Sequence, residues 1–276
     1  MLTRIITSIV ALGIFAGVLF LPPIFFTIAM AAVTLVMLYE CYSATRANTG
    51  MKIIGFISAA LLMLSIYRIS YANTQAIPLI IISVILIIML HMILIIAEHN
   101  KKSYSEVLAN GFLTLYVVIA MSCIWLSKQL FDSNVYMLLI FFCAWSTDTF
   151  AYFTGKALGR HKLIPHVSPN KTVEGSIGGV IGAMVICSLY LYIINSFFEP
   201  SAISNDYLAN GIIFGAVGGV FSQLGDLAAS AIKRDTNIKD FGWIFPGHGG
   251  FMDRFDSVIF IAPFIFGLLI LPIVRI

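Results

Sequence analysis

Residues 76–97 read AIPLIIISVILIIMLHMILIIA and contain no Asp, Glu, Lys or Arg. A helix that spans a membrane needs roughly 20 mostly apolar residues, because the hydrocarbon core of a bilayer is about 30 Å thick. The run is continuous and does not alternate between polar and apolar residues, as a membrane-spanning strand would. This stretch therefore predicts a transmembrane α-helix.

Eight other segments have the same character, so the sequence predicts about nine membrane-spanning helices. The nine segments are residues 4–21, 24–45, 52–71, 76–97, 107–127, 135–155, 176–198, 208–232 and 255–275. The first segment lacks a clear small-x-small cleavage site, so we expect a retained helix rather than a signal peptide. Of all residues, 60% are hydrophobic and 11% are charged, whereas soluble domains carry roughly 25% charged residues. The predicted fold class is all-α, a polytopic membrane helix bundle in a single transmembrane domain over residues 1–276.

The connections between these segments differ in charge. The turns after odd-numbered segments, at 22–23, 71–75, 127–134 and 198–207, are short or weakly charged. One side of the membrane then receives 13 of the 16 Lys and Arg residues: Arg46, Lys52, Lys101, Lys102, Lys156, Arg160, Lys162, Lys171, Lys233, Arg234, Lys239, Arg254 and Arg275. The other side receives Arg4, Arg68 and Lys128. By the positive-inside rule we expect the N-terminus outside and the C-terminus in the cytoplasm.

Other polar and reactive residues favour structural roles. Each of the four cysteines, Cys41, Cys123, Cys143 and Cys187, stands alone in an apolar run, which is typical of small buried hydrophobic residues and implies no disulfide framework. Glu40, His91 and Glu98 lie near helix ends, where a lone polar side chain is usually packed or reaches toward the interface. The net charge of +3 is too small to indicate nucleic-acid binding.

Much of the polar chemistry lies in residues 225–256, which read GDLAASAIKRDTNIKDFGWIFPGHGGFMDRFD. Asp226 falls near the cytoplasmic end of an apolar helix, where a carboxylate is costly unless it has a partner or a function. Ser230, Lys233 and Arg234 follow Asp226 at spacings of four, seven and eight residues. These spacings predict that the four side chains share one helix face.

A glycine-rich turn and two further carboxylates close this stretch. The glycines of residues 246–250, PGHGG, permit tight turns and close approach to a ligand. Asp253 and Asp256 follow, and a spacing of three residues on a helix points both carboxylates the same way. Together with Asp226 and the nearby cations they suit a polyphosphate carried by Mg²⁺. The alternative is a set of interfacial ion pairs at a helix end.

A second polar stretch, residues 146–179, reads STDTFAYFTGKALGRHKLIPHVSPNKTVEGSIGG. Asp148 lies within an apolar run, and basic residues follow at the cytoplasmic edge. Thr172 is placed to cap the next helix, whose first amides would then offer an anion site. The basic groups are candidates for binding a triphosphate or an anionic lipid head group. The alternative is an anchor loop with affinity for anionic lipids.

Three recurring patterns join these stretches. They are Ser230-x2-Lys233-Arg234-x4-Lys239-Asp240-x-Gly242-x3-Pro246-Gly247-His248-Gly249-Gly250-x2-Asp253-Arg254-x-Asp256, Asp148-Thr149-x-Ala151-Tyr152-x2-Gly155, and Ser168-Pro169-x-Lys171-Thr172-x-Glu174-Gly175. In these patterns the chain resembles the phosphatidate cytidylyltransferases, or CDP-diacylglycerol synthases. The resemblance covers the C-terminal half, so residues 135–276 are predicted to be catalytic, and residues 1–134, which carry no motif, to form a scaffold.

The resemblance implies that CTP and phosphatidate react to give CDP-diacylglycerol and pyrophosphate. Asp226, Asp253 and Asp256 are then predicted to hold Mg²⁺, with a second cation left open. The other residues assigned to catalysis are Ser230, Lys233, Arg234, Lys239, Asp240, His248 and Arg254. Substrate binding is assigned to Asp148, Arg160, Lys162, Ser168, Lys171, Thr172, Glu174, Gly249 and Gly250. Lys233, Arg234 and Lys239 are expected to hold phosphates, while Asp240, His248 and Arg254 order the site.

Rival functions remain open on the sequence. A polyprenol kinase or a CDP-archaeol synthase would use similar carboxylates with a different lipid. The D-G-x2-A-R…G-x3-D-x3-D pattern of CDP-alcohol phosphotransferases is absent. A transporter would suit the intramembrane Asp148 and Asp226, but it needs no basic loop that ends in paired carboxylates.

The expected partners are CTP, phosphatidate and membrane lipids, without nucleic acid. Glycine-rich faces such as Gly215–Gly219 are compatible with a homodimer. The expected location is a bacterial cytoplasmic (inner) membrane, because a small single-domain enzyme suits it, with the active site facing the cytoplasm.

Overall fold

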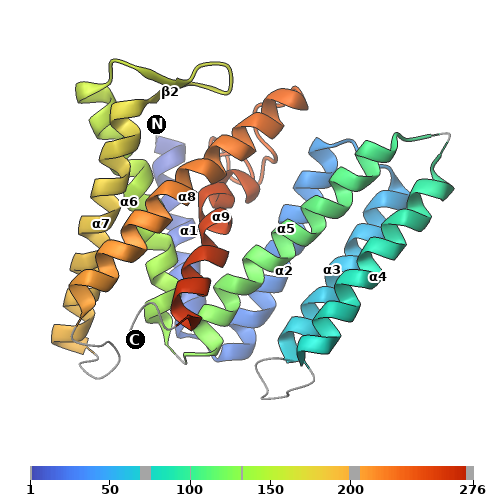
Figure 1. The fold of residues 1–276 in the computed structure, drawn as a ribbon, viewed down its shortest axis with the longest axis horizontal. Helices are drawn as coiled ribbons and strands as arrows, with labels where there is room; N and C mark the ends of the chain where they lie inside the picture. Colours follow the sequence, from blue (N-terminus) through green and yellow to red (C-terminus); the bar gives the residue numbers. More distant parts are fainter. Residues whose placement is uncertain (1, 69–75, 100, 132, 199–205, 272–276) are drawn as a thin grey trace. The chain divides into compact units, whose positions relative to one another are not determined.

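The computed structural model describes residues 2–68, 76–99, 101–131, 133–198 and 206–271 (Figure 1). Within these ranges the chain forms nine α-helices, a π-helical turn and one small hairpin. The helices are α1 (Leu2–Phe20), α2 (Pro23–Ala44), α3 (Thr49–Tyr67), α4 (Ala76–Ala97), α5 (Tyr104–Gln129), α6 (Asn134–Leu158), α7 (Val173–Ile193) with η2 (Ile194–Phe198), α8 (Tyr207–Asp235) and α9 (Met252–Ile270).

All nine predicted helices are present, with ends that differ from the prediction by a few residues. Among the described residues, seven helices, α2 to α8, are long and apolar enough to cross a membrane. The chain is therefore an integral membrane protein with several spans. The first turns of α9 carry Asp253, Arg254 and Asp256, which lowers the apolar character of that helix. The predicted turn at 71–75, most of the turn at 198–207, and Arg275 lie outside the described residues.

A short hairpin departs from the all-α prediction. Strands β1 (Lys162–Ile164) and β2 (Ser168–Thr172) pair antiparallel, with Lys162 opposite Thr172 and Ile164 opposite Ser168. Lys162 Nζ also donates a hydrogen bond to the carbonyl oxygen of Pro169, at 2.6 Å. The sequence pattern missed these strands because they are only three and five residues long and lie in a connection between helices, without an alternating apolar face.

Contacts along the chain divide it into two compact units. Unit 1 holds Met1–Trp125 and Thr236–Arg254, and unit 2 holds Leu126–Asp235 and Phe255–Ile276. Unit 1 therefore contains α1 to α4, α5 as far as Trp125, the connection after α8 and the first residues of α9. Unit 2 contains α6 to α8, the hairpin and the rest of α9.

In unit 2, glycines let α6, α7 and α8 pack side by side (Figure 1). A Cβ atom added at Gly211 or Gly215 of α8 would overlap the backbone of α7, and one at Gly219 would lie 3.0 Å from the Cα of Val180. The three glycines are four residues apart, so they form one stripe along α8. Because lipid tails give no hydrophobic drive between helices, small residues favour association by close backbone contact. The Gly215–Gly219 face, considered above for a homodimer, is thus covered by α7.

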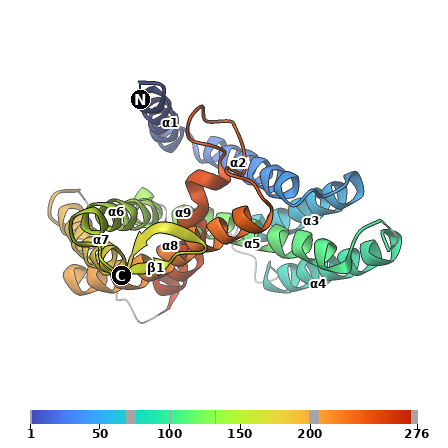
Figure 2. The same ribbon diagram turned by 90° about the horizontal axis from the view of Figure 1, so that it is seen from above.

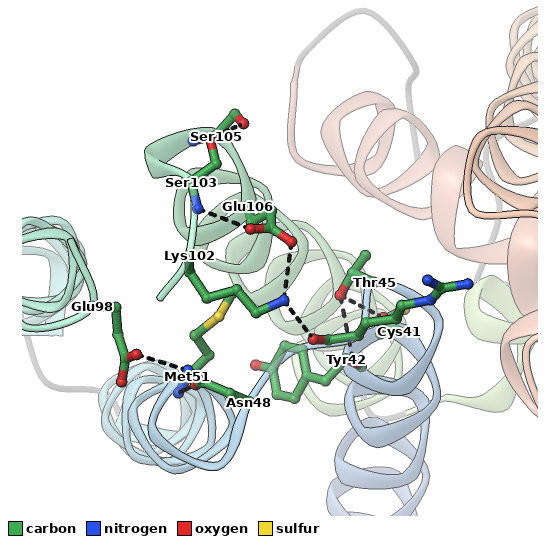
Figure 3. A network of polar contacts seen from close by, with 11 residues as sticks. Cys41, Tyr42, Thr45, Asn48, Met51, Glu98, Lys102, Ser103, Ser105 and Glu106 are labelled. Carbon is green, nitrogen blue, oxygen red and sulfur yellow. Dashed lines mark hydrogen bonds and ion pairs between the residues drawn. The ribbon is translucent and has the colours of Figure 1, made fainter. Parts of the chain in front are cut away.

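In unit 1, a polar network joins the connection between α2 and α3 to the start of α5 (Figure 3). Lys102 Nζ donates to the carbonyl oxygen of Arg46 at 3.1 Å and to Glu106 Oε1 at 3.0 Å. The amide of Ser103 donates to Glu106 Oε2 at 2.9 Å, which satisfies a backbone donor at the helix start. The end of α2 is therefore tied to α5.

Two of the lone polar residues of unit 1 have structural partners, as predicted. Glu98 Oε2 accepts a hydrogen bond from Asn48 Nδ2 at 2.8 Å. His91 is buried, with Nδ1 2.8 Å from the carbonyl oxygen of Ile87 and Nε2 3.3 Å from Asn110 Oδ1. All four cysteines are buried and form no disulfide, which confirms their assignment as small core residues.

The start of α1 lies against the connection between α8 and α9. Thr7 Oγ1 is 3.0 Å from His248 Nδ1, and both residues belong to unit 1. The predicted sides of the membrane, with the N-terminus outside and the C-terminus in the cytoplasm, stay a prediction.

Candidate functional site

In unit 2, charged side chains gather around the last third of α8. At 1.5 Å per residue the 29 residues of α8 span about 43 Å, whereas the hydrocarbon core is about 30 Å thick. The last third of the helix, which carries Asp226, can therefore reach the polar boundary. Asp226 Oδ2 forms an ion pair with Lys171 Nζ at 2.6 Å, and Asp226 Oδ1 accepts a hydrogen bond from Ser230 Oγ at 3.3 Å. The predicted shared face of Asp226 and Ser230 is confirmed.

The start of α9 within unit 2 approaches the same part of α8. A Cβ atom added at Gly225 would lie 2.7 Å from the carbonyl oxygen of Asp256, so only glycine allows this approach. The charges that act on Asp256 are those of Asp226, Lys233 and Asp148. Asp256 therefore faces an environment of mixed charge, made by side chains from three helices.

Asp148 brings a third carboxylate to this part of unit 2. Its Oδ2 accepts a hydrogen bond from Ser257 Oγ at 3.5 Å, and the amide of Ser257 donates to Asp256 Oδ1 at 2.8 Å. The side chain of Asp148 is exposed, although it lies ten residues before the end of α6, or about 15 Å along the helix. A carboxylate at that depth requires water or a polar partner. The five residues Asp148, Lys171, Asp226, Lys233 and Asp256 are called the charged cluster below.

The hairpin of unit 2 holds Lys171 in place. Thr172 is the N-cap of α7, and its Oγ1 accepts a hydrogen bond from the amide of Gly175 at 3.1 Å, as predicted. Glu174 accepts hydrogen bonds from the amides of Arg160 and His161, at 3.1 and 3.2 Å, and lies 2.6 Å from His161 Nδ1. The predicted substrate residues Glu174 and Thr172 thus shape the hairpin that carries Lys171.

The glycine-rich connection of unit 1 forms a tight turn. The amide of Phe245 donates to the carbonyl oxygen of Gly249, and the amide of His248 donates to that of Phe245, both at 2.8 Å. Gly247 and Gly249 have φ angles of 79° and 82°, a left-handed conformation that favours glycine. The predicted need for glycine in this turn is therefore confirmed at these two positions.

Asp253 organises this connection from the first turn of α9. Its Oδ2 accepts hydrogen bonds from the amides of Phe241 at 2.7 Å and Gly250 at 3.0 Å, and the residue is 7% exposed. Among the described residues, no group of three or more His, Cys, Asp or Glu side chains is placed to hold a metal ion. The structure thus does not gather Asp253 with Asp226 and Asp256 as a set of ligands.

Glu40 of α2 makes a contact with the start of α9 that the sequence analysis did not predict. Its Oε1 accepts a hydrogen bond from the amide of Phe251 at 3.0 Å, and its Oε2 accepts one from the amide of Met252 at 2.8 Å. The first amides of a helix have no partner within the helix, so Glu40 caps α9. Figure 2 shows the connection before α9 passing beside α2. The only signal in the sequence was a carboxylate within an apolar run. The prediction that Glu40 is a packed side chain was correct, but the sequence did not identify α9 as its partner.

Comparison with known proteins extends the similarity over the whole chain. Residues 2–271 match the model of the cytidylyltransferase family. Over 276 residues, 97% of each chain, the protein is 34% identical to the phosphatidate cytidylyltransferase of Bacillus subtilis (strain 168). The chain belongs to the phosphatidate cytidylyltransferase family. It is also 39% identical over 175 residues to the Staphylococcus haemolyticus phosphatidate cytidylyltransferase, covering 63% of this chain and 64% of the relative. With the Staphylococcus aureus (strain COL) protein it shares 44% identity over 135 residues, 49% of each chain.

The remaining predicted residues of this phosphatidate cytidylyltransferase family member fall into two groups. Arg234 of unit 2 and Lys239, Asp240 and Arg254 of unit 1 have exposed side chains. His248 contacts Thr7, and Ser168 pairs with Ile164 in the hairpin. Membership of the family over residues 2–271 also includes α1 to α5, which carried no motif, so these helices belong to the shared fold.

Proposed function

We propose that this protein transfers the cytidylyl group of CTP to phosphatidate, which gives CDP-diacylglycerol and pyrophosphate. Family membership over nearly the whole chain supports this activity. The structural observation that carries it is the ion pair of Lys171 with Asp226, next to Asp256, in unit 2. A half-buried ammonium group that can exchange its carboxylate partner for a phosphate is suited to binding CTP.

The reaction needs little help from a general base. The nucleophile is a phosphate oxygen of phosphatidate, which is already anionic at neutral pH, so a strong base is less necessary than for an alcohol. The main obstacle is repulsion between the two anionic substrates, together with charge that grows on the leaving pyrophosphate. Lys171 and Lys233 would offset that charge by positioned electrostatic stabilisation. The hydroxyl of Ser230 is placed beside Asp226 to donate a further hydrogen bond to a phosphate.

Mg²⁺ prefers oxygen ligands such as carboxylates. In proteins the ion is commonly held by one or two carboxylates together with substrate phosphates. The start of α9 lies against α8 at Gly225, and the charge of Asp226 acts on Asp256, which supports such a site. We assign these two carboxylates to one Mg²⁺ ion, with Asp253 retained as a predicted third ligand and a second cation left open. When bound, the ion would neutralise phosphate charge as a Lewis acid.

We assign the charged cluster to the cytoplasmic side. The hairpin and the α8–α9 connection are rich in Lys and Arg residues, and the positive-inside rule predicts that such connections are cytoplasmic. CTP would arrive from the cytoplasm and phosphatidate from within the bilayer. The bacterial relatives support a cytoplasmic membrane as the location, and a homodimer remains a prediction.

A label-transfer assay tests the proposed activity. Purified protein in mixed micelles with phosphatidate is given CTP labelled at the α-phosphate, with Mg²⁺ or with excess EDTA. We expect the label to enter the lipid together with an equal amount of pyrophosphate, and only when Mg²⁺ is present. Archaetidate and polyprenol are offered in parallel. Label transfer to archaetidate alone, or release of labelled CDP in the presence of polyprenol without label in a lipid, would refute the proposed substrate, and label transfer in EDTA would refute the metal requirement.

A further inference from the structure

Two carboxylates of unit 1 hold three consecutive backbone amides at the start of α9. Asp253 accepts from the amide of Gly250, and Glu40 accepts from those of Phe251 and Met252. Asp253 also accepts from the amide of Phe241, at the other end of the glycine-rich connection. The connection and the first turn of α9 therefore depend on both carboxylates for their backbone conformation.

Glu40 is packed too closely to be replaced without effect. It is 3% exposed, and a Cβ atom added at Gly242 or Gly250 would overlap its carboxylate. A buried carboxylate is costly unless its oxygens accept hydrogen bonds, and each oxygen of Glu40 accepts one. Its negative charge also lies at the positive end of the helix dipole of α9.

The helix that carries Glu40 is itself held firmly in unit 1. Tyr42 Oη, two residues after Glu40, forms a buried hydrogen bond of 2.6 Å with Thr114 Oγ1 of α5. The carbonyl oxygen of Arg46, just beyond α2, accepts from Lys102. Movement of Glu40 is thus opposed from two sides, and the carboxylate can act as a fixed point for the connection before α9.

We propose that Glu40 is a positioning residue for cytidylyl transfer. It fixes the first turn of α9, on which Asp253 lies and from which the helix continues to Asp256. This role gives α2 an indirect part in the reaction, and it rests on the function proposed above. Glu40 acts through the backbone of α9 rather than by touching either substrate, so its loss should affect turnover more than substrate binding.

The test is Glu40→Gln, with Glu98→Gln as the matched control. Glutamine keeps the size of the side chain, but its NH2 group faces one of the two amide donors and leaves it without an acceptor. We expect kcat to fall about tenfold or more, because small displacements of reacting groups cost one to two orders of magnitude. The KM values for CTP and phosphatidate should change less than twofold to threefold by the same reasoning. Glu98 also accepts a hydrogen bond in unit 1 but lies outside the connection, so its variant should retain wild-type kcat.

Specific outcomes would overturn the proposal. One is a folded Glu40→Gln protein with wild-type kcat, and another is a kcat loss that matches its loss of folded protein at the assay temperature. If the variant does not fold, hydrogen exchange in the wild-type protein decides: slow exchange at the Phe251 and Met252 amides is expected, and exchange as fast as in an open loop contradicts the role. An inactive wild-type protein would instead refute the proposed function.

Discussion

Replacement of Asp256 by asparagine is expected to lower kcat/KM for CTP by about 1,000-fold, equivalent to about 4 kcal/mol of transition-state stabilisation. Asn has nearly the same shape as Asp but carries no charge. Asp256 lies close to Asp226, Lys233 and Asp148 in unit 2, so the change removes one of the two carboxylates assigned to Mg²⁺. The measurement is the initial rate of CDP-diacylglycerol formation over a range of CTP concentrations.

Asp235→Asn is the control for this change. Asp235 ends α8 in the same unit, has an exposed side chain and lies outside the charged cluster. Its variant should keep kcat/KM within about twofold of the wild-type value, as expected for an exposed residue with no part in the site. Full activity of a folded Asp256→Asn protein would remove Asp256 from the reaction.

Replacement of Lys171 by alanine is expected to lower kcat/KM for CTP by about 100-fold, since phosphate clamps of this kind contribute a few kcal/mol. The change removes a cation and also leaves Asp226 without its partner at 2.6 Å. The uncompensated carboxylate would repel the triphosphate, so both binding and turnover should suffer. Steady-state kinetics at saturating Mg²⁺ would measure the two effects separately.

Lys156→Ala provides the comparison for Lys171→Ala. Lys156 is an exposed cation near the end of α6, 6.0 Å from the ring centre of Tyr152, and it lies outside the charged cluster. An equal loss of kcat/KM in Lys156→Ala and Lys171→Ala would indicate a general effect of surface charge instead of a specific site. Lys171→Arg should recover only part of the activity, because a planar guanidinium does not replace a compact ammonium in a confined space.

The helices and the main motifs could be predicted from the sequence because they depend on local signals. Continuous apolar runs such as residues 76–97 require little beyond length, and the N-cap role of Thr172 follows from its place before a helix. The ion pair between Lys171 and Asp226 joins residues that are both in recognised motifs, but nothing in their spacing could pair them. It arises from the packing of α7 on α8.

Other features depend on contacts between distant parts of the chain. Glu40 caps a helix more than 200 residues away, and no periodicity in α2 marks that role. Asp253 was predicted from its motif as a metal ligand, whereas the structure uses one of its oxygens to bind two amides of the connection. The contact of Thr7 with His248 joins residues 241 positions apart, and no spacing in the sequence marks it.

The central claim, that Asp226 and Asp256 hold a divalent cation together with CTP, is tested most directly by Mn²⁺ binding. Electron paramagnetic resonance would measure Mn²⁺ bound to the purified protein with and without CTP, in the wild type and in Asp226→Asn, Asp256→Asn and Asp235→Asn. We expect CTP-dependent Mn²⁺ binding in the wild type and in Asp235→Asn, and its loss in the other two variants. Unchanged Mn²⁺ binding in both Asp226→Asn and Asp256→Asn would contradict the claim.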